Sequence, residues 1–170
     1  NHKTAPVEIR EKVAFGPDII VAALRGLREQ AGAEEAVILS TCNRTEIYAC
    51  VDESGVDALS DWVSEFHGLE KSQLAPYLYA HSEVDCVTHL MKVSSGLDSL
   101  ILGEPQILGQ VKDAYQVSVS AKASGKLLDR LFQHTFSVAK QVRTDTAIGS
   151  SPVSVAFAAV NLAKQIFADL

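Results

Sequence analysis

The residues best suited to chemistry are Cys42 and Arg44, which stand two positions apart where an apolar run gives way to polar residues. A thiolate attacks carbonyl carbons, and a nearby cation and free turn amides stabilise the thiolate or a developing oxyanion. A small core cysteine is the structural alternative, and Cys50 and Cys86 are interpreted in that way because core-pattern residues flank them. From the residues alone, Cys42 is a candidate nucleophile with this alternative open.

A histidine is the next candidate. His89 lies on an expected helix, with Asp85 one turn earlier, where its carboxylate could fix the tautomer of the imidazole. A packed or surface histidine is the alternative. Cys86 and His89 supply only two metal ligands where a structural zinc needs four, so we predict no metal site.

A glycine-broken segment from about residue 95 to residue 110 gathers polar side chains among leucines and isoleucines. They are Ser99, Glu104, Gln106 and Gln110. Glycines let a backbone approach a ligand, so one interpretation is the wall of a polar pocket. The other is a loop followed by a helix, with Glu104 serving the positive end of the helix dipole.

Composition limits the function classes. The 170 residues suffice for one large domain or two small ones, and no apolar stretch is long enough to span a membrane. Three cysteines form neither an even set nor a C-x-x-C pair, which favours a reducing, cytoplasmic setting. The formal charge of −6 argues against nucleic-acid binding by bulk electrostatics but allows a local basic face.

Two further patterns bear on binding. The sequence contains no G-x-G-x-x-G, P-loop or H-E-x-x-H motif, so it offers no nucleotide site of its own. A modest basic set is interpreted as a solvated face, with nucleic-acid contact as the alternative. Its members are Lys122, Lys126, Arg130, Lys140 and Arg143.

Hydrophobic periodicity predicts an α/β part followed by helices. We expect a helix from Pro17 to about residue 31, strands at 36–39 and 47–51, a helix at 56–67, an edge strand at 76–79 and a helix opened by a capping box at 82–85. Pro6 is expected to prevent an earlier helix, and the strand at 47–51 to bury only the face of Ile47, Ala49 and Val51. With one strand supplied before Asn1, the fold class is α+β, a split βαβ (ferredoxin-like) sandwich followed by a helical subdomain.

Three helices are expected in the second half, at 105–121, at 126–144 and from Ser151 onward. We therefore divide the chain into an α/β subdomain (1–90), a helical subdomain (91–150) and the start of a connecting segment (151–170). The sequence begins without Met and ends within an unfinished helical pattern, so we expect the whole protein to contain further parts.

Five stretches, in order along almost the whole chain, resemble the motifs of the glutamyl-tRNA reductase family. They are residues 1–6 (NHKTAP), 40–46 (STCNRTE), 95–99 (SGLDS), 102–111 (LGEPQILGQV) and 136–140 (FSVAK). Outside these motifs, Gly16 stands where a better helix cap is expected. The resemblance implies a catalytic domain, an NADPH-binding domain absent from this chain, and an absent C-terminal domain through which a homodimer forms.

The resemblance also implies a chemistry. Cys42 would attack the ester that joins glutamate to its tRNA, and NADPH would reduce the resulting thioester to glutamate-1-semialdehyde, a tetrapyrrole (porphyrin) precursor. His89 matches a residue important for activity, no metal is implied, and glutamate-1-semialdehyde aminomutase is an expected partner. The positions that match substrate-binding residues are Thr41, Cys42, Asn43, Arg44, Ser99, Glu104, Pro105, Gln106 and Gln110.

The residues allow a further assignment within that pocket. The Arg44 guanidinium suits a bidentate contact with the side-chain carboxylate of the substrate, whereas Glu104 suits its ammonium group. A non-catalytic module that binds tRNA or another partner is the alternative function. A simple thiol hydrolase of small esters is a third hypothesis.

Overall fold

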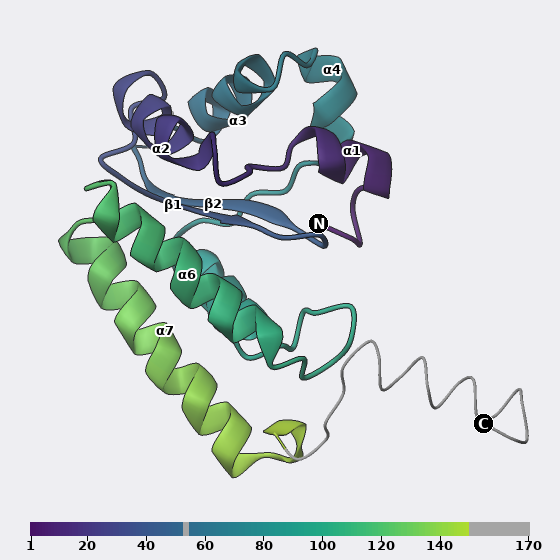
Figure 1. The fold of residues 1–170 in the computed structure, drawn as a ribbon, viewed down its shortest axis with the longest axis vertical. Coiled ribbons are helices and arrows are strands. Elements are labelled where there is room, and N and C mark those ends of the chain that lie inside the picture. The colour runs from purple at the N-terminus through teal and green to yellow at the C-terminus, as the bar shows by residue number, and fades with distance from the viewer. Residues whose placement is uncertain (53–54, 150–170) are drawn as a thin grey trace, which may run out of the picture.

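The fold is organised around a two-stranded antiparallel ribbon with helices on both faces (Figure 1). The computed structural model describes residues 1–52 and 55–149. The strands are β1 (Glu35–Ser40) and β2 (Thr45–Cys50), and Glu35 lies opposite Cys50. The helices are α1 (Val7–Lys12), α2 (Ile20–Glu29), α3 (Gly55–Phe66), α4 (Lys71–Leu74), η1 (Ala75–Tyr77), α5 (Glu83–Ser94), α6 (Gln106–Ser120), α7 (Lys126–Asp145) and η2 (Ala147–Gly149).

One face of the ribbon packs against α2 and α3. The apolar positions of α2 recur at helical spacing, so Ala23, Leu24 and Leu27 lie on one buried stripe. This stripe contacts Ile38 of β1, and Trp62 of α3 completes the cluster. Apolar burial on this scale is the main favourable contribution to folding.

The other face packs against α6 and α7, which lie side by side beneath the ribbon in Figure 1. Both helices bury residues at successive intervals of four, three and four positions, the spacing of one helix face. These residues are Ile107, Val111, Ala114 and Ser118 of α6, and Leu128, Phe132, Thr135 and Ala139 of α7. Val37, Leu39 and Tyr48 of the ribbon join them in a second core.

Two polar contacts fix α6 and α7 against β1. The Glu35 carboxylate accepts hydrogen bonds from the backbone N–H groups of Leu127 (3.1 Å) and Leu128 (2.7 Å), which the first turn of α7 leaves without helical partners. Ser118 donates its hydroxyl to the Ala36 carbonyl at 2.5 Å. Helices α6 and α7 therefore share one hydrophobic core with the ribbon.

The α+β class is confirmed. The helices expected at 17–31, 56–67, 105–121 and 126–144 correspond to α2, α3, α6 and α7, and Gly32 ends the first with a φ of +72°. The ferredoxin-like sandwich is not confirmed, because the described residues form only two strands. The helix expected from Ser151 lies outside the described residues.

Two predictions near prolines are wrong. Residues 75–77 form η1, with Pro76 near its start, instead of lying within an edge strand, because the chain there turns back so that Tyr79 reaches β2. Pro6 does not prevent a helix but immediately precedes α1. A proline is compatible with a helix N-terminus because no N–H of its own needs a partner there.

Two side-chain predictions are also wrong. Ser82 precedes α5, but its side chain makes no capping hydrogen bond, and the Asp85 N–H is bonded to the Ser82 carbonyl instead. In β2, Glu46 and Tyr48 are more buried than Ile47 and Ala49. The reason is that helices cover both faces of the ribbon, so the polar face is enclosed as well.

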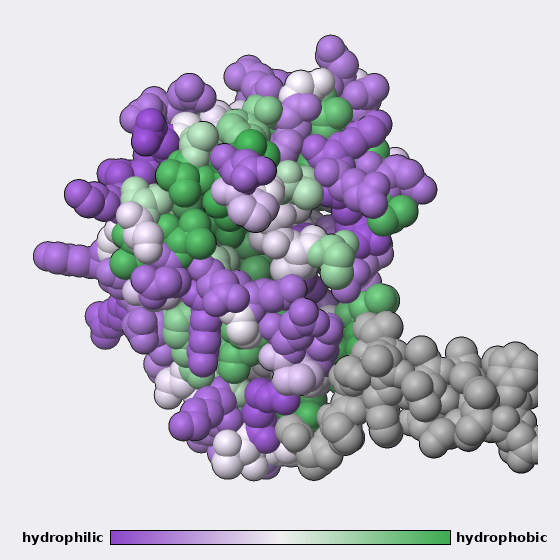
Figure 2. Space-filling view, in the orientation of Figure 1, coloured by the Kyte–Doolittle hydropathy of each residue, from purple (hydrophilic) through white to green (hydrophobic). Residues whose placement is uncertain are grey.

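The surface is mostly polar. In the space-filling view, hydrophilic residues cover much of the face shown, and apolar residues gather in its upper half, between α2 and α6 (Figure 2). Among the residues that the structure describes, no helix combines the length and the apolar character needed to cross a membrane.

Replacing Phe132 with alanine tests the core beneath the ribbon. Phe132 is fully buried, and its ring contacts those of Tyr48 and Tyr115 at centroid distances of 5.7 and 5.4 Å. We expect Phe132→Ala to lower the free energy of unfolding by about 3–5 kcal/mol, measured by urea denaturation. Leu127→Ala, at a position of the same helix that is 63% exposed, is the control and should change stability little. Equal losses in the two variants would contradict the described packing.

Candidate active site

Cys42 lies in the tight turn that joins β1 to β2. The Thr41 N–H donates to the Arg44 carbonyl at 2.8 Å, and the Thr41 hydroxyl accepts from the N–H groups of Asn43 (3.2 Å) and Arg44 (3.1 Å). The Cys42 side chain is exposed. The turn is therefore closed by its own backbone and by Thr41, and it presents the thiol to solvent.

Residues of the N-terminal segment and of α1 form hydrogen bonds to this turn. The His2 N–H donates to the Asn43 carbonyl at 2.8 Å. One N–H group of Arg10, from α1, donates to the Cys42 carbonyl, and the same nitrogen lies 3.3 Å from Asn43 Oδ1. The backbone on both sides of the thiol is thereby held in place.

Arg44 points into the protein, and its side chain is only 1% exposed. Its Nη1 lies 2.6 Å from Glu46 Oε1, and its Nη2 contacts the Asp98 carbonyl (2.5 Å) and carboxylate (3.0 Å). Burial alone would lower the pKa of Arg44, but the charge of Glu46 and the Asp98 hydrogen bond raise it, so the guanidinium stays charged.

Glu46 is the centre of the site. Its Oε1 accepts from Arg44, from the Tyr79 hydroxyl and, at 2.9 Å, lies next to Nε2 of His89, while Oε2 accepts from the Tyr48 hydroxyl. Burial would raise the pKa of this carboxyl, but the His89 hydrogen bond and the Arg44 charge outweigh burial and lower the pKa to about 2. Glu46 is therefore an anion that joins β2, α5 and the segment after η1.

The same network shifts the pKa values of the neighbouring side chains. Burial and the Glu46 anion raise the pKa of both Tyr48 and Tyr79, so the two tyrosines stay neutral donors. Burial opposes ionisation of Asp98, but its hydrogen bonds with Lys3 and Arg44 prevail and lower its pKa. The ion pair between Lys3 and Asp98 ties the N-terminal segment to the loop that follows α5.

The expected partner of His89 is wrong. Asp85 is exposed, and the imidazole instead bonds through Nε2 to the Glu46 carboxylate, which accepts at 2.9 Å. The rings of Tyr79 and His81 lie against His89, at centroid distances of 5.7 and 4.7 Å. Where the structure describes the chain, no three His, Cys, Asp or Glu side chains are grouped as metal ligands.

The glycine-broken segment folds back on itself beside this network. The Gly103 N–H donates to the Gly96 carbonyl at 2.9 Å, and a Cβ on Gly96 would lie 3.1 Å from the Gly103 Cα, closer than most side chains tolerate. Both glycines have a positive φ, which favours glycine. The loop thus carries Asp98 to Arg44 and places Glu104 next to Gly96.

The remaining predicted residues lie on this loop and at the start of α6. Pro105 directly precedes α6, and the other four have side chains that make no hydrogen bond within the described part of the chain. They are Ser99, Glu104, Gln106 and Gln110. Contact between these side chains and a substrate stays a prediction.

Reasoning from the sequence missed Glu46, Tyr48, Tyr79 and Asp98 as parts of the site. One signal was available for two of them. Glu46 and Tyr48 in β2, and Arg44 directly before it, are spaced two residues apart, so their side chains project from the same face of the ribbon. For Tyr79 and Asp98 no such local pattern exists, because the loops that bring them in are set by the tertiary fold.

The three cysteines differ in environment. Burial raises the pKa of Cys50 to about 11 and raises the pKa of Cys86, so neither forms a thiolate readily near neutral pH. Cys42 is the exposed thiol of the chain. The exposed thiol is thus the one on the turn next to the buried network.

Comparison with known proteins shows the family of the chain. The family described as "Glutamyl-tRNAGlu reductase, N-terminal domain" matches residues 1–146. The chain belongs to the glutamyl-tRNA reductase family. Glutamyl-tRNA reductase from Alkalilimnicola ehrlichii is 60% identical over 169 residues, which cover 99% of this chain and 38% of that protein. The protein of the same name from Pseudomonas putida (strain GB-1) is 59% identical over 170 residues, covering 100% of this chain and 40% of that protein.

A solved structure extends the likeness to the fold. Glutamyl-tRNA reductase from Methanopyrus kandleri superimposes with a TM-score of 0.78 at 32% identity, over 96% of this chain and 38% of that chain. The chain therefore spans about two fifths of the length of these members of the glutamyl-tRNA reductase family.

The central position of Glu46 predicts a pH-dependent loss of stability. At neutral pH, we expect Glu46→Gln to lower the free energy of unfolding by about 3–5 kcal/mol, because the buried Arg44 charge loses one of its two carboxylate partners and keeps only Asp98. Because the folded pKa lies below the usual 4.5, the Glu46 contribution is complete above that value and is lost as the pH falls towards about 2.

The difference between wild type and Glu46→Gln should therefore shrink across that window. Urea denaturation at neutral pH and near pH 2 measures it, with Glu34→Gln, at an exposed glutamate, as the control. A difference that is the same at both pH values would contradict the buried anion.

Proposed function

We propose that this chain carries the acyl-transfer step of a glutamyl-tRNA reductase, with Cys42 as the nucleophile. The observation that supports this most is an exposed thiol on a turn held by a buried charged network. The names of the relatives supply the substrate, a tRNA esterified with glutamate. Cys42 is the one thiol whose exposure suits attack on so large a substrate.

The chemistry is a transfer of the glutamyl group. The Cys42 thiolate forms a bond to the carbonyl carbon of the ester, and the bond from that carbon to the ribose oxygen of the tRNA breaks. The ribose oxygen takes up a proton, and the glutamyl group remains on Sγ as a thioester. This step needs the thiol, a positioned carbonyl and donors for the oxyanion, and no redox change.

Thr41, Asn43 and Arg44 are proposed to act mainly by holding the turn. The Thr41 hydroxyl accepts from the backbone N–H groups of Asn43 and Arg44, and the Arg44 side chain donates to the Asp98 carbonyl. A direct contact of Arg44 with the substrate carboxylate remains a proposal, and it requires Asp98 to release Nη2. The uncommitted carboxylate of Glu104 is suited to the substrate ammonium group, and Ser99, Gln106 and Gln110 to its other polar atoms.

His89 is proposed as a positioning residue. His89 bonds to Glu46, and Glu46 bonds to Arg44. The imidazole therefore acts on the turn only through these two side chains. Loss of the imidazole would remove one donor from a buried carboxylate and loosen the network that sets the turn.

Reduction requires a part of the protein beyond these residues. NADPH supplies the hydride that converts a thioester into an aldehyde, here glutamate-1-semialdehyde. The 170 residues contain no G-x-G-x-x-G turn to hold its pyrophosphate, so this chain does not fit the cofactor and we assign none of its residues to hydride transfer.

The wider architecture is proposed on the same basis. Residues 1–90 and 91–150 would together form the catalytic unit, and residues 151–170 would lead towards the NADPH-binding part. A ferredoxin-like arrangement would need at least one further strand, supplied from outside residues 1–170. A homodimer, a cytoplasmic location and transfer of the aldehyde to an aminomutase complete the proposal.

Trapping the acyl-enzyme tests the proposed nucleophile. Wild-type protein mixed with glutamyl-tRNA without NADPH should gain one glutamyl group on Cys42, detected by mass spectrometry after an acid quench. Cys42→Ser should lose this adduct and slow release of tRNA by about a thousandfold or more.

Two matched controls accompany this test. Cys50→Ser and Cys86→Ser remove partly buried thiols with raised pKa values and should keep the adduct on Cys42. Full ester cleavage by Cys42→Ser would show that the nucleophile lies elsewhere.

A further inference from the structure

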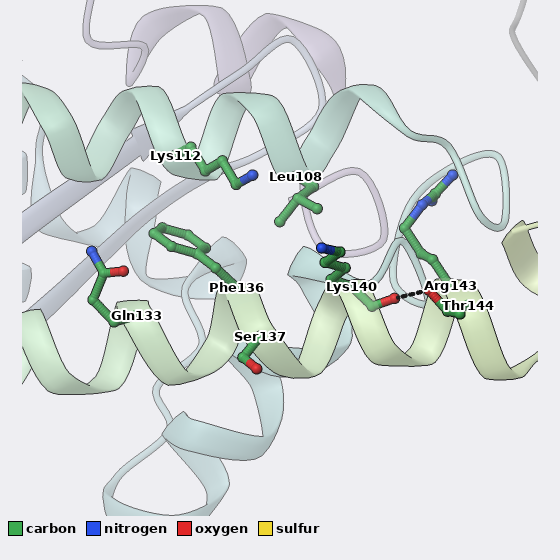
Figure 3. Close-up of a pocket in the computed structure, with 8 residues that line it drawn as sticks. All are labelled: Leu108, Lys112, Gln133, Phe136, Ser137, Lys140, Arg143 and Thr144. Carbon is green, nitrogen blue, oxygen red and sulfur yellow. Dashed lines mark hydrogen bonds between the residues drawn. The ribbon is translucent and has the colours of Figure 1, made fainter.

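A basic groove lies between α6 and α7, on residues that the proposed acyl transfer does not use. It encloses about 580 Å³, and side chains of both helices point into it (Figure 3). Its cationic residues are Lys112 of α6 and Lys140 and Arg143 of α7. Exposed Gln133 and Ser137 add polar side chains to the same groove.

The groove belongs to a locally positive part of an acidic protein. Residues 106–145 contain six lysines and arginines against three aspartates, whereas the rest of the chain contains nine against eighteen acidic residues. One of the three aspartates, Asp129, accepts hydrogen bonds from Tyr115 and Ser124. Such a separation of charge gives this surface a positive potential despite the net charge of −6.

Two of the groove cations, Lys112 and Lys140, are available to a ligand. Within the described residues, neither Lys112 nor Lys140 forms an ion pair, and Lys112 Nζ lies 5.8 Å from the centre of the Phe136 ring. Exposed lysines on a helix are ordinarily only solvated. Here three cations from two helices line one hollow together with amide and hydroxyl groups, which is the donor set that contacts phosphate and ribose oxygens.

The groove is also connected to the candidate active site. Arg143 Nη1 donates to the Gly103 carbonyl at 3.1 Å, and Gly103 in turn bonds to Gly96 in the loop that carries Asp98. Hydrogen bonds therefore link one end of the groove to the loop that contacts Arg44.

We propose that the α6–α7 groove binds the sugar–phosphate backbone of the tRNA part of the substrate. The proposal rests on the proposed function for the identity of the RNA. Lys112 and Lys140 neutralise phosphates, while Gln133 and Ser137 contact phosphate or ribose oxygens. Contacts of this kind position an RNA and carry no base identity. An acidic protein could also bind these cations, but in that case replacing them would leave the affinity for tRNA unchanged.

The test measures the salt dependence of tRNA binding by the whole protein. Each lysine that neutralises a phosphate contributes about one to the slope of log affinity against log salt concentration. In a titration with deacylated glutamate tRNA, Lys112→Gln/Lys140→Gln should bind more weakly and lower the slope by about two. A tRNA for another amino acid should lose affinity by the same factor.

Two matched double variants complete the test. Arg25→Gln/Lys92→Gln removes the same charge from exposed positions of α2 and α5 and should keep the wild-type slope. Lys112→Arg/Lys140→Arg keeps the charge in the groove and should also keep the slope. An unchanged slope in the glutamine variant, or an equal loss in the arginine variant, would overturn the proposal.

The result of this binding test can be distinguished from the result of the thioester test of the proposed function. If wild-type protein forms the Cys42 thioester but the glutamine variant keeps its slope, the groove proposal alone is wrong. If wild-type protein forms no thioester, the proposed function is wrong whatever the slopes show.

Discussion

The buried ion pair between Arg44 and Glu46 is the interaction on which the rest of the site depends. A carboxylate this far from water is costly unless donors surround it, and Glu46 has four, from Arg44, Tyr48, Tyr79 and His89. These donors come from the ribbon, from the segment after η1 and from α5. One anion therefore fixes three separate stretches of chain, and through Arg44 it fixes the Asp98 loop as a fourth.

Two residues close together in sequence have opposite orientations at this site. Arg44 is directed inward, where two carboxylates hold it, while Cys42 two residues earlier faces solvent. The motifs at residues 1–6, 40–46 and 95–99 meet here, because His2 bonds to Asn43 and Asp98 pairs with both Lys3 and Arg44. The exposed Cys42 thiol thus lies on a turn that is held through Arg44 by buried charges.

The sequence predicted the periodic parts of this structure and missed the contacts that loops create. The stripes of α2, α6 and α7 follow from helical spacing alone, and β1 follows from its apolar run. Glu46 was misread because a polar residue alternating with apolar ones ordinarily faces water, and only the helices on the second face enclose it. Tyr79 and Asp98 reach the site across long sequence separations, which no local pattern encodes.

Amide hydrogen exchange in Glu46→Gln tests most directly whether one carboxylate holds these segments together. Compared with wild type under native conditions, we expect faster exchange in the Cys42 turn (41–44), in the Tyr79 segment after η1, in α5 around His89 and in the loop at 96–104, while α2 and α3 keep their protection. Glu34→Gln, at an exposed glutamate near β1, should leave all of these segments unchanged. Faster exchange confined to β2 would contradict the account.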